Sequence, residues 1–442
     1  MSQESLLAGS EPEPKALPPV PAGAPRFQAA VRNQGEWVST ELDRLLEPDH
    51  RVRDVWRFVE SLDLAPFYGR IRAVEKGAGR PPIDPKILMA LWLYATVEGV
   101  GSARALARLC DEHVAYRWIC GGVGVNHHTL SDFRTQNGEA LDLLLTQSVA
   151  SLMAEGLVRL ERVAQDGVRV RASAGAASFR GKDALSQCLK QAQEQVETLK
   201  RELDEDPAAT TVRQAAARTR AAREREERVR RAIEQREAAE AKKSEAEEKK
   251  RESRASTTDA EARVMKMGDG GFRPAMNAQF VTDVASQIVV GVAAGNVGND
   301  GGLLGPMLVQ IEERYAKRPK AALADGGYVN VIDFEAAAAR GIDVYAPTRV
   351  DKRSKQDPHV PHEGDGPGMA AWRIRMGTPQ AKEIYKERAA TAECVNALAR
   401  HRGLRQLLVR GVAKARAVFL WFALAHNLMR AVSLRGLAAT SA

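Results

Sequence analysis

An acid and a base share one face of a helix near the end of the chain. Residues 378–400 have the composition of a helix, and Glu393, Asn396 and Arg400 stand in it at positions i, i+3 and i+7. Side chains at this spacing project from the same side of a helix. The pattern fits either a polar group placed for chemistry or an ordinary solvated face, and the helix alone does not distinguish the two.

Two further carboxylates lie in apolar, strand-like segments far from this helix in the sequence. Asp166 lies in VAQDGVRVRAS, which predicts a strand over about 162–172, and Asp325 ends the apolar segment AALAD before two glycines. A carboxylate buried in a strand is costly unless it is paired or bound to a metal. Asp166, Asp325 and Glu393 are therefore candidates for one metal site.

The chemistry that needs three such acids is cleavage and transfer of a phosphodiester. Two magnesium ions about 3.5 to 4 Å apart can activate a water or a 3′-hydroxyl on one side of the phosphorus and stabilise the leaving oxygen on the other. Magnesium prefers hard oxygen ligands and keeps several waters and substrate phosphates. Three Asp and Glu side chains without a Cys or His ligand are the set expected for it.

Length and charge limit the classes of partner. The chain has 442 residues and a formal net charge of +8, with a sequence pI of about 9.3. This length exceeds a typical single core, so we expect two or more domains. The positive balance favours a polyanionic partner over an acidic small molecule, and nucleic acid is the expected one.

The cysteines and the apolar runs indicate the cellular compartment in which the protein is expected. Cys110, Cys120, Cys188 and Cys394 show no C-x-x-C pairing and no His at zinc spacing, so neither a zinc ribbon nor a disulfide framework is supported. We expect reduced, mostly buried thiols. No secretory signal is recognised, and no run is expected to approach the roughly 18 apolar residues of a membrane helix. The sequence predicts a cytoplasmic protein, associated with the nucleoid when bound to DNA.

The N-terminal part is expected to contain a tail and a helical module. Residues 1–35 are rich in Pro, Ala, Gly and Glu without periodicity, which predicts a disordered tail. Residues 36–160 show helical patterns, with Asp84 and Ser102 as N-caps. Short helices with Gly-containing turns and exposed arginines are typical of a helix-turn-helix DNA-binding domain, with an ordinary helical packing domain as the alternative. The arginines expected to be exposed are Arg104, Arg108, Arg117 and Arg134.

A segment of different composition interrupts the second half. Residues 183–255 are dense in Glu, Arg, Lys, Gln and Ala, and their second run has almost no large apolar side chains. Such a run forms a solvent-exposed helix held by i,i+4 ion pairs, or a helical hairpin. We interpret it as a charged helical insertion.

The flanking parts, residues 161–182 and 256–442, alternate strands and helices. In order they give a strand with Asp166, the insertion, a hairpin, a helix with Asp300 as its N-cap, a strand ending in Asp325, a helix, a strand, a helix with the third acid and a buried C-terminal helix. This order is that of the RNase H-like fold, in which strand and helix carboxylates converge at one end of a mixed sheet. We predict an α/β, RNase H-like catalytic domain beside the N-terminal all-α domain.

Two smaller expectations concern the end of the chain. A loop rich in Pro, Gly and charge is predicted over residues 347–370, directly before the helix that carries the third acid. The closing helix is apolar around most of its circumference and is therefore expected to be buried. Its Trp421, Phe422 and His426 are expected to be core residues.

These residues resemble the bacterial insertion-sequence transposases of the DDE type. The resemblance covers about residues 40–435 and rests on the helical N-terminal module, the QDG strand, the ADGGY strand end and the helix with YKERAATAE. In this family the helix bears Tyr, Arg, Glu and a distal basic residue. That signature corresponds here to Tyr385, Arg388, Glu393 and Arg400.

The resemblance implies roles for these side chains. Asp166, Asp325 and Glu393 would hold two Mg²⁺ ions, or Mn²⁺ in their place. The side chains expected to contact double-stranded DNA are Tyr385, Arg388 and Arg400 on the helix and Arg104, Arg108 and Arg134 in the N-terminal module. Arginine suits DNA because its guanidinium binds phosphate oxygens in a bidentate way.

The signature departs from the usual form at two positions. Four residues separate Arg388 from Glu393 where three are usual, and Arg400 stands where lysine is usual. Glu383 and Glu387 therefore compete for the role of third acid, and either could instead pair with Arg388. Glu393 is preferred because it shares its face with polar partners.

The function that this resemblance implies is cut-and-paste transposition. The protein would bind the terminal inverted repeats of its element as a homodimer on DNA, hydrolyse the ends and join the freed 3′-hydroxyls to target DNA. A metal-dependent nuclease of the same fold without strand transfer is one alternative. A catalytically inactive DNA-binding protein is another, although the presence of all three acids argues against it.

Overall fold

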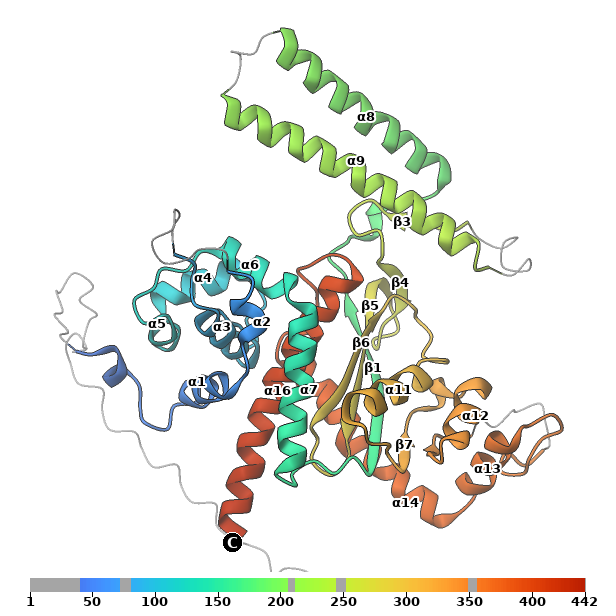
Figure 1. Cartoon of the computed structure of the whole chain (residues 1–442). Helices are drawn as coiled ribbons and strands as arrows, with labels where there is room; N and C mark the ends of the chain where they lie inside the picture. The colour runs from blue at the N-terminus through green and yellow to red at the C-terminus, as the bar shows by residue number, and fades with distance from the viewer. Residues whose placement is uncertain (1–39, 72–80, 206–210, 244–251, 349–355, 442) are drawn as a thin grey trace, which may run out of the picture. The chain divides into compact units, whose positions relative to one another are not determined.

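The computed structural model divides by its internal contacts into residues 1–41 and residues 42–442. The predicted tail, 1–35, lies outside the residues whose structure is described. The described residues are 40–71, 81–205, 211–243, 252–348 and 356–441. Figure 1 shows the elements of the larger unit.

The N-terminal part of the larger unit is helical, as predicted. Asp84 accepts a hydrogen bond from the backbone N–H of Lys86, and Ser102 accepts one from Ala105, so both predicted N-caps are confirmed. The described helices here are η1 (Leu42–Leu45), α1 (Arg51–Ser61), α2 (Ala65–Tyr68), α3 (Pro85–Val97), α4 (Ala103–Glu112), α5 (Val114–Cys120), α6 (His127–Gln136) and α7 (Gly138–Ala154).

A mixed sheet follows, so the predicted α/β class is confirmed. Its order is β4-β5-β1-β7-β8, with β6 paired to β5. The strand β1 is antiparallel to β5 and parallel to β7, and β7 is parallel to β8. The strands are β1 (Arg162–Arg171), β4 (Arg263–Lys266), β5 (Phe272–Asp283), β6 (Val289–Gly295), β7 (Ala321–Leu323) and β8 (Asp343–Tyr345). The hairpin predicted from the sequence is β5–β6, whereas β4 was not predicted.

Helices connect the strands and follow the last one. The predicted single helix over 378–400 is α14, a π-helical turn and α15 in succession. A further helix, α13, lies partly inside the predicted loop 347–370, of which residues 349–355 are outside the described residues. The elements are α11 (Leu304–Tyr315), the 3-10 turn η3 (Gly326–Tyr328), α12 (Val331–Ala339), α13 (Pro367–Met376), α14 (Pro379–Arg388), the π turn η4 (Ala389–Glu393), α15 (Cys394–His401) and α16 (Val412–Ser441).

The C-terminal helix α16 packs against both the helices and the sheet. It contacts α3, α6, α7 and β6, and α7 runs beside it in Figure 1. Trp421, Phe422 and His426 are buried, as predicted. Residues 412–437 are also long and apolar enough to cross a membrane, so the expectation that no such run exists is wrong by length and composition. Because 72% of that stretch is buried inside the protein, it has the character of a core helix.

The charged insertion forms a helical hairpin of α8 (Lys182–Glu205) and α9 (Val212–Glu240). The two helices lie side by side (Figure 1). At its base Leu185 of α8 packs with Ala232 of α9 and with Ala255. Ala255 belongs to β3 (Ala255–Ser256), which pairs with β2 (Phe179–Arg180) after the 3-10 turn η2 (Ala176–Ser178). The i,i+4 ion pairs predicted for the second run are present on α9, between Glu226 and Arg230 for example.

The four cysteines are free, as predicted. Cys110 and Cys120 are buried, whereas Cys188 and Cys394 are half-buried. The expectation of mostly buried thiols is therefore met by two of them.

Candidate active site

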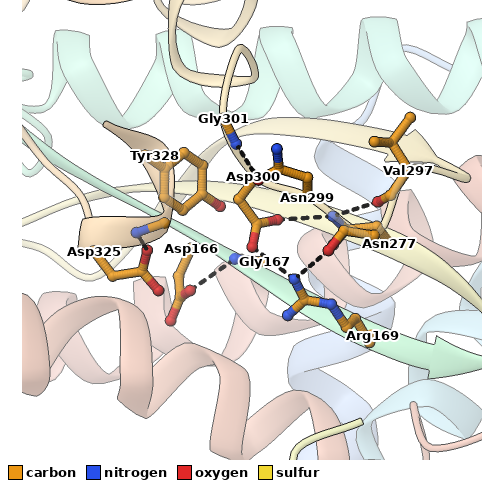
Figure 2. A network of polar contacts seen from close by, with 12 residues as sticks. Asp166, Gly167, Arg169, Asn277, Val297, Asn299, Asp300, Gly301, Asp325 and Tyr328 are labelled. Atoms are coloured by element: carbon orange, nitrogen blue, oxygen red, sulfur yellow. Dashed lines mark hydrogen bonds and ion pairs between the residues drawn. The ribbon is translucent and has the colours of Figure 1, made fainter. Parts of the chain in front are cut away.

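Two neighbouring parallel strands carry the first two acids to the same level of the sheet. The first three residues of β1 pair in register with the three residues of β7. Continuing that register by two residues brings Asp325 opposite Asp166. The Asp325 side chain also accepts the backbone N–H of Gly327 at 2.6 Å, which fixes the turn after β7. Figure 2 shows both aspartates near Tyr328.

A glycine follows Asp166 because no side chain would fit there. A Cβ atom on Gly167 would lie 2.5 Å from the amide nitrogen of Gln279 and 3.0 Å from side-chain oxygens of Asn277 and Asp300. The Gly167 N–H donates to the Asp166 carboxylate at 2.8 Å. The Asp-Gly pair is thus required by a polar cluster that packs directly against β1.

Asp300 is the centre of that cluster and does not cap a helix. Its carboxylate accepts hydrogen bonds from Asn277 at 2.8 Å, from Gln279 at 3.1 Å and from Arg169 at 2.8 Å (Figure 2). The predicted N-cap role is wrong, because α11 begins at Leu304, whose N–H is bound by Asp333. The side chains of β5 and β1 satisfy this buried acid instead.

Arg388 lies between the three predicted acids. Its Nη2 is 3.0 Å from Asp166 Oδ2 and 3.9 Å from Asp325 Oδ2, and its Nη1 is 2.9 Å from Glu393 Oε1. One guanidinium therefore brings together carboxylates from β1, from the end of β7 and from the π turn.

The π turn explains how Glu393 reaches Arg388. These residues are five apart, whereas side chains that meet on an α-helix are three or four apart. A π-helical turn closes i to i+5 hydrogen bonds, so residues five apart stack on one side. The turn packs against β1 and β5, and Gln287 donates to its Ala390 carbonyl at 2.8 Å. It accommodates the extra residue by which this chain departs from the usual signature.

The acids differ in their access to solvent. The side chain of Asp166 is 16% exposed, that of Asp325 41% and that of Glu393 58%. Burial raises the pKa of Asp166 despite the opposing charge of Arg388. Burial disfavours the Arg388 cation, but the surrounding acids, Asp166 first, hold its pKa above the usual value. Asp166 and Arg388 thus form a buried ion pair, whereas the Glu393 carboxylate of the same site is exposed.

The competing acids on the same helix are engaged elsewhere. Glu387 accepts two hydrogen bonds from Arg162, at 2.9 and 3.0 Å. Glu383 is exposed and pairs with Lys386 at 2.7 Å. The geometry therefore favours Glu393 as the acid that stands with Asp166.

The other residues of the signature helix have different surroundings. Tyr385 is half-buried beside Arg388, and burial raises its pKa. Arg400 is exposed. Asn396 is buried, so the alternative of an ordinary solvated face does not hold for all three of Glu393, Asn396 and Arg400.

The predicted arginines of the helical part also differ from one another. Arg104 and Arg108 are exposed on α4. The expectation that Arg134 is exposed is wrong: its guanidinium stacks on Trp92 and donates to the Gly101 carbonyl. Burial lowers its pKa to about 10. Arg134 thus packs α6 against neighbouring elements. Unlike Arg104 and Arg108, its guanidinium is not exposed to solvent.

Comparison with known protein families adds two matches. A Transposase domain (DUF772) matches residues 40–136, which span most of the helical part. A Transposase DDE domain matches residues 368–432, which include Arg388, Glu393 and most of α16. Together they support an insertion-sequence transposase of the DDE type. No curated protein and no solved structure matches the chain.

DDE transposases generally use divalent metal ions. Among the described residues of this chain, no three His, Cys, Asp or Glu side chains are arranged to hold one ion as they stand. The donor set nevertheless fits such a cation, because Asp166, Asp325 and Glu393 supply only oxygen atoms. They already surround one positive group, the Arg388 guanidinium, which stands in for a cation among them.

Proposed function

We propose that this transposase binds the ends of an insertion sequence, cleaves the phosphodiester backbone there and joins the 3′ ends to target DNA. The observation that carries the proposal is the convergence of Asp166, Asp325 and Glu393 on one cation. Acids brought together from separate elements at such electrostatic cost are typical of a site for chemistry. The order of these acids along the chain, with two aspartates followed by a glutamate, also supports a DDE-type active site.

The proposal includes an RNase H-like catalytic domain made of residues 161–182 and 256–442. An antiparallel hairpin on one side of β1 and two parallel strands on the other support this fold. Residues 36–160 would form the DNA-binding domain, and residues 183–255 an insertion in the catalytic domain. The transposase would act in the cytoplasm, as a homodimer on DNA.

In the proposed mechanism, Asp166, Asp325 and Glu393 hold two Mg²⁺ or Mn²⁺ ions. When bound, these ions would activate the attacking water or 3′-hydroxyl and stabilise the leaving oxygen. Arg388 offsets part of the negative charge of the three acids in the free protein and would withdraw from among them if they took metal. Its guanidinium would then be free to bind a DNA phosphate, since arginine recognises phosphate in a bidentate way.

Other side chains would position the DNA. Tyr385 beside Arg388 and the exposed Arg400 would contact the cleaved end. Arg104 and Arg108 lie one turn apart on α4 and are exposed together, so they would contact the duplex from the helical domain.

The test is a strand-transfer assay with the full chain. Labelled duplex carrying the element end is incubated with Mg²⁺ and an unlabelled target, and the products are separated by length. Joined product is expected, and it should disappear with EDTA or in the Asp166→Asn variant. Cleavage without joining would identify a nuclease, whereas binding without cleavage would identify an inactive DNA-binding protein.

A further inference from the structure

We infer that the base of the α8–α9 hairpin carries a second site, a pocket for the phosphate backbone of duplex DNA. The inference rests on the proposed function, because that function supplies the DNA. The pocket has a volume of about 290 Å³ and lies where three segments meet. Its polar lining is Arg225 and Arg228 of α9, Thr257 and Thr258 after β3, and Arg410 before α16.

The charges in this pocket are poorly compensated. Among the described residues, the lining includes three guanidinium groups and no carboxylate. Arg225 donates to the neutral amide of Gln195 at 2.9 Å, and Arg228 lies 4.0 Å from Glu224. Like charges gathered in this way repel one another. A phosphate would offset that repulsion and accept charge-assisted hydrogen bonds from the arginines.

Arg410 contributes a charge from outside the hairpin. The nearby Asp259 attracts it electrostatically, but that carboxylate is buried and accepts the backbone N–H of Gly411 at 3.1 Å. Among the described residues Arg410 forms no ion pair, and its exposed guanidinium can face an anion in the pocket. The half-buried Thr258 adds a hydroxyl group suited to a phosphate oxygen, whereas the Thr257 hydroxyl donates to the Ser178 carbonyl at 3.4 Å.

The pocket continues along the hairpin, and this extension favours a polymer over a single phosphate. A second hollow of about 500 Å³ is lined by Arg218 together with Arg225 and Arg228. These positions lie on one side of α9 and extend over about 15 Å at 1.5 Å per residue. Successive phosphates of one DNA strand advance about 3.4 Å along the duplex axis. The row therefore matches the length of about four phosphates.

The same helix offers a matched control. Arg230 and Arg231 follow directly, but each is paired with a glutamate one turn earlier, Glu226 and Glu227. Their charge is compensated within the helix, and neither lines the pocket. Replacing both changes the net charge by the same amount as replacing Arg225 and Arg228.

The test measures DNA affinity against salt concentration. Full-length wild type, Arg225→Gln/Arg228→Gln and Arg230→Gln/Arg231→Gln are titrated with a fluorescent duplex of random sequence at several KCl concentrations. Each phosphate contact contributes about 0.9 to the slope of log affinity against log salt, so the first double variant should lose about 1.8. The second should keep the wild-type slope. Circular dichroism checks that both double variants fold. The Arg410→Gln variant, which lies outside the hairpin, should independently reduce the slope of log affinity against log salt by about 0.9.

The outcomes separate this inference from the proposed function. A steep wild-type slope that neither Arg225→Gln/Arg228→Gln nor Arg410→Gln reduces would overturn the pocket and leave the transposase proposal standing. An unchanged slope with altered sedimentation of the first variant would make the surface a protein interface, which also overturns it. A wild-type protein that neither binds duplex nor cleaves element ends would remove the proposed function itself.

Discussion

The guanidinium of Arg388 lies 3.0 Å from the carboxylate of Asp166, with both side chains largely withdrawn from water at 9% and 16% exposure. Each partner compensates the desolvation of the other, so removing either side chain alone lowers the free energy of unfolding. Asp325 and Glu393 add two more negative charges around the same group. Three acids against one base leave an excess of negative charge, which favours a further cation.

Arg388→Gln should destabilise the metal-free protein by about 3 kcal/mol, because Asp166 is left as an uncompensated buried charge. Arg388→Gln/Asp166→Asn should recover part of this loss, since both charges are then absent. Urea unfolding of the wild type, both single variants and the double variant measures the coupling between the two positions. Simple additivity of the two single effects would contradict the buried ion pair.

The same variant should respond more strongly to metal. In Arg388→Gln the acids no longer share their site with a guanidinium, so Mn²⁺ should raise its melting temperature more than that of the wild type without DNA. Asp325→Asn/Arg388→Gln is the control, and it should lose the added response. An equal Mn²⁺ effect in wild type and Arg388→Gln would show that Arg388 does not compete with the ion.

Asp166→Asn, Asp325→Asn and Glu393→Gln should each abolish cleavage of element ends while keeping end binding. Each change preserves side-chain shape but removes a charge that the metal ions need. A gel assay for cleavage beside a binding titration separates the two effects. Glu383→Gln is the matched control on the same helix, because its carboxylate is exposed and pairs only with Lys386 among the described residues. Loss of cleavage in Glu383→Gln together with normal cleavage in Glu393→Gln would identify Glu383, and not Glu393, as the third acid.

The sequence singled out the candidate acids but did not show how the fold brings them together. Alternation and apolar runs were enough for β1 and the β5–β6 hairpin, and residue type was enough to single out Asp166 and Asp325. The π turn was not predictable from periodicity, because helical patterns assume a constant angle between residues. Without it Arg388 and Glu393 do not meet at this spacing, and the sequence analysis did not predict their contact.

Asp300 shows a second limit of local patterns. An acid shortly before an apolar helix is typical of an N-cap, and this local signal predicted the wrong partners. The actual partners, Asn277 and Arg169, come from β5 and β1 and are polar residues on strands. Only the pairing register of these strands places them beside Asp300, and that register is not a local property.

Asp300→Asn should destabilise the protein by about 1 to 3 kcal/mol. One of the two carboxylate oxygens becomes an NH2 group, which cannot accept the hydrogen bond from Arg169 or from Asn277. Thermal and urea unfolding measure the loss. Asp84→Asn is the control at a true N-cap, where asparagine caps about as well as aspartate. Equal stability of the two variants would show that the Asp300 cluster is not a closed network.

Stability should fall in mild acid because of His426. Burial lowers the pKa of this histidine from 6.5 to about 4, although its Nε2 lies 2.8 Å from the Gln287 carbonyl. The unfolded chain therefore binds a proton at a higher pH than the folded chain. The neutral form's contribution is fully present above pH 6.5 and is lost as pH falls toward 4, a change on the order of 3 kcal/mol.

The measurement is urea unfolding between pH 7.5 and pH 5 for wild type and His426→Gln. Glutamine keeps an N–H for the Gln287 carbonyl and does not titrate, so its stability should depend less on pH over this range. Identical pH profiles would assign the acid sensitivity to other groups.

The last prediction concerns the π turn itself. Deleting Ala390, which is exposed within the turn, restores three residues between Arg388 and Glu393. A π turn absorbs one inserted residue while the helix on either side keeps its direction, so removal should leave a regular α-helix with the two side chains at i and i+4. We expect the deletion variant to fold, to keep the Arg388–Glu393 pair and to cleave element ends within about tenfold of wild type, a change of about 1.4 kcal/mol in the barrier.

Deleting the exposed Ala397 from α15 is the control. No π turn is there to absorb the change, so buried Ala399 rotates out of the core and stability should fall. If the Ala390 deletion folds but does not cleave while wild type does, the turn does more than accommodate an extra residue.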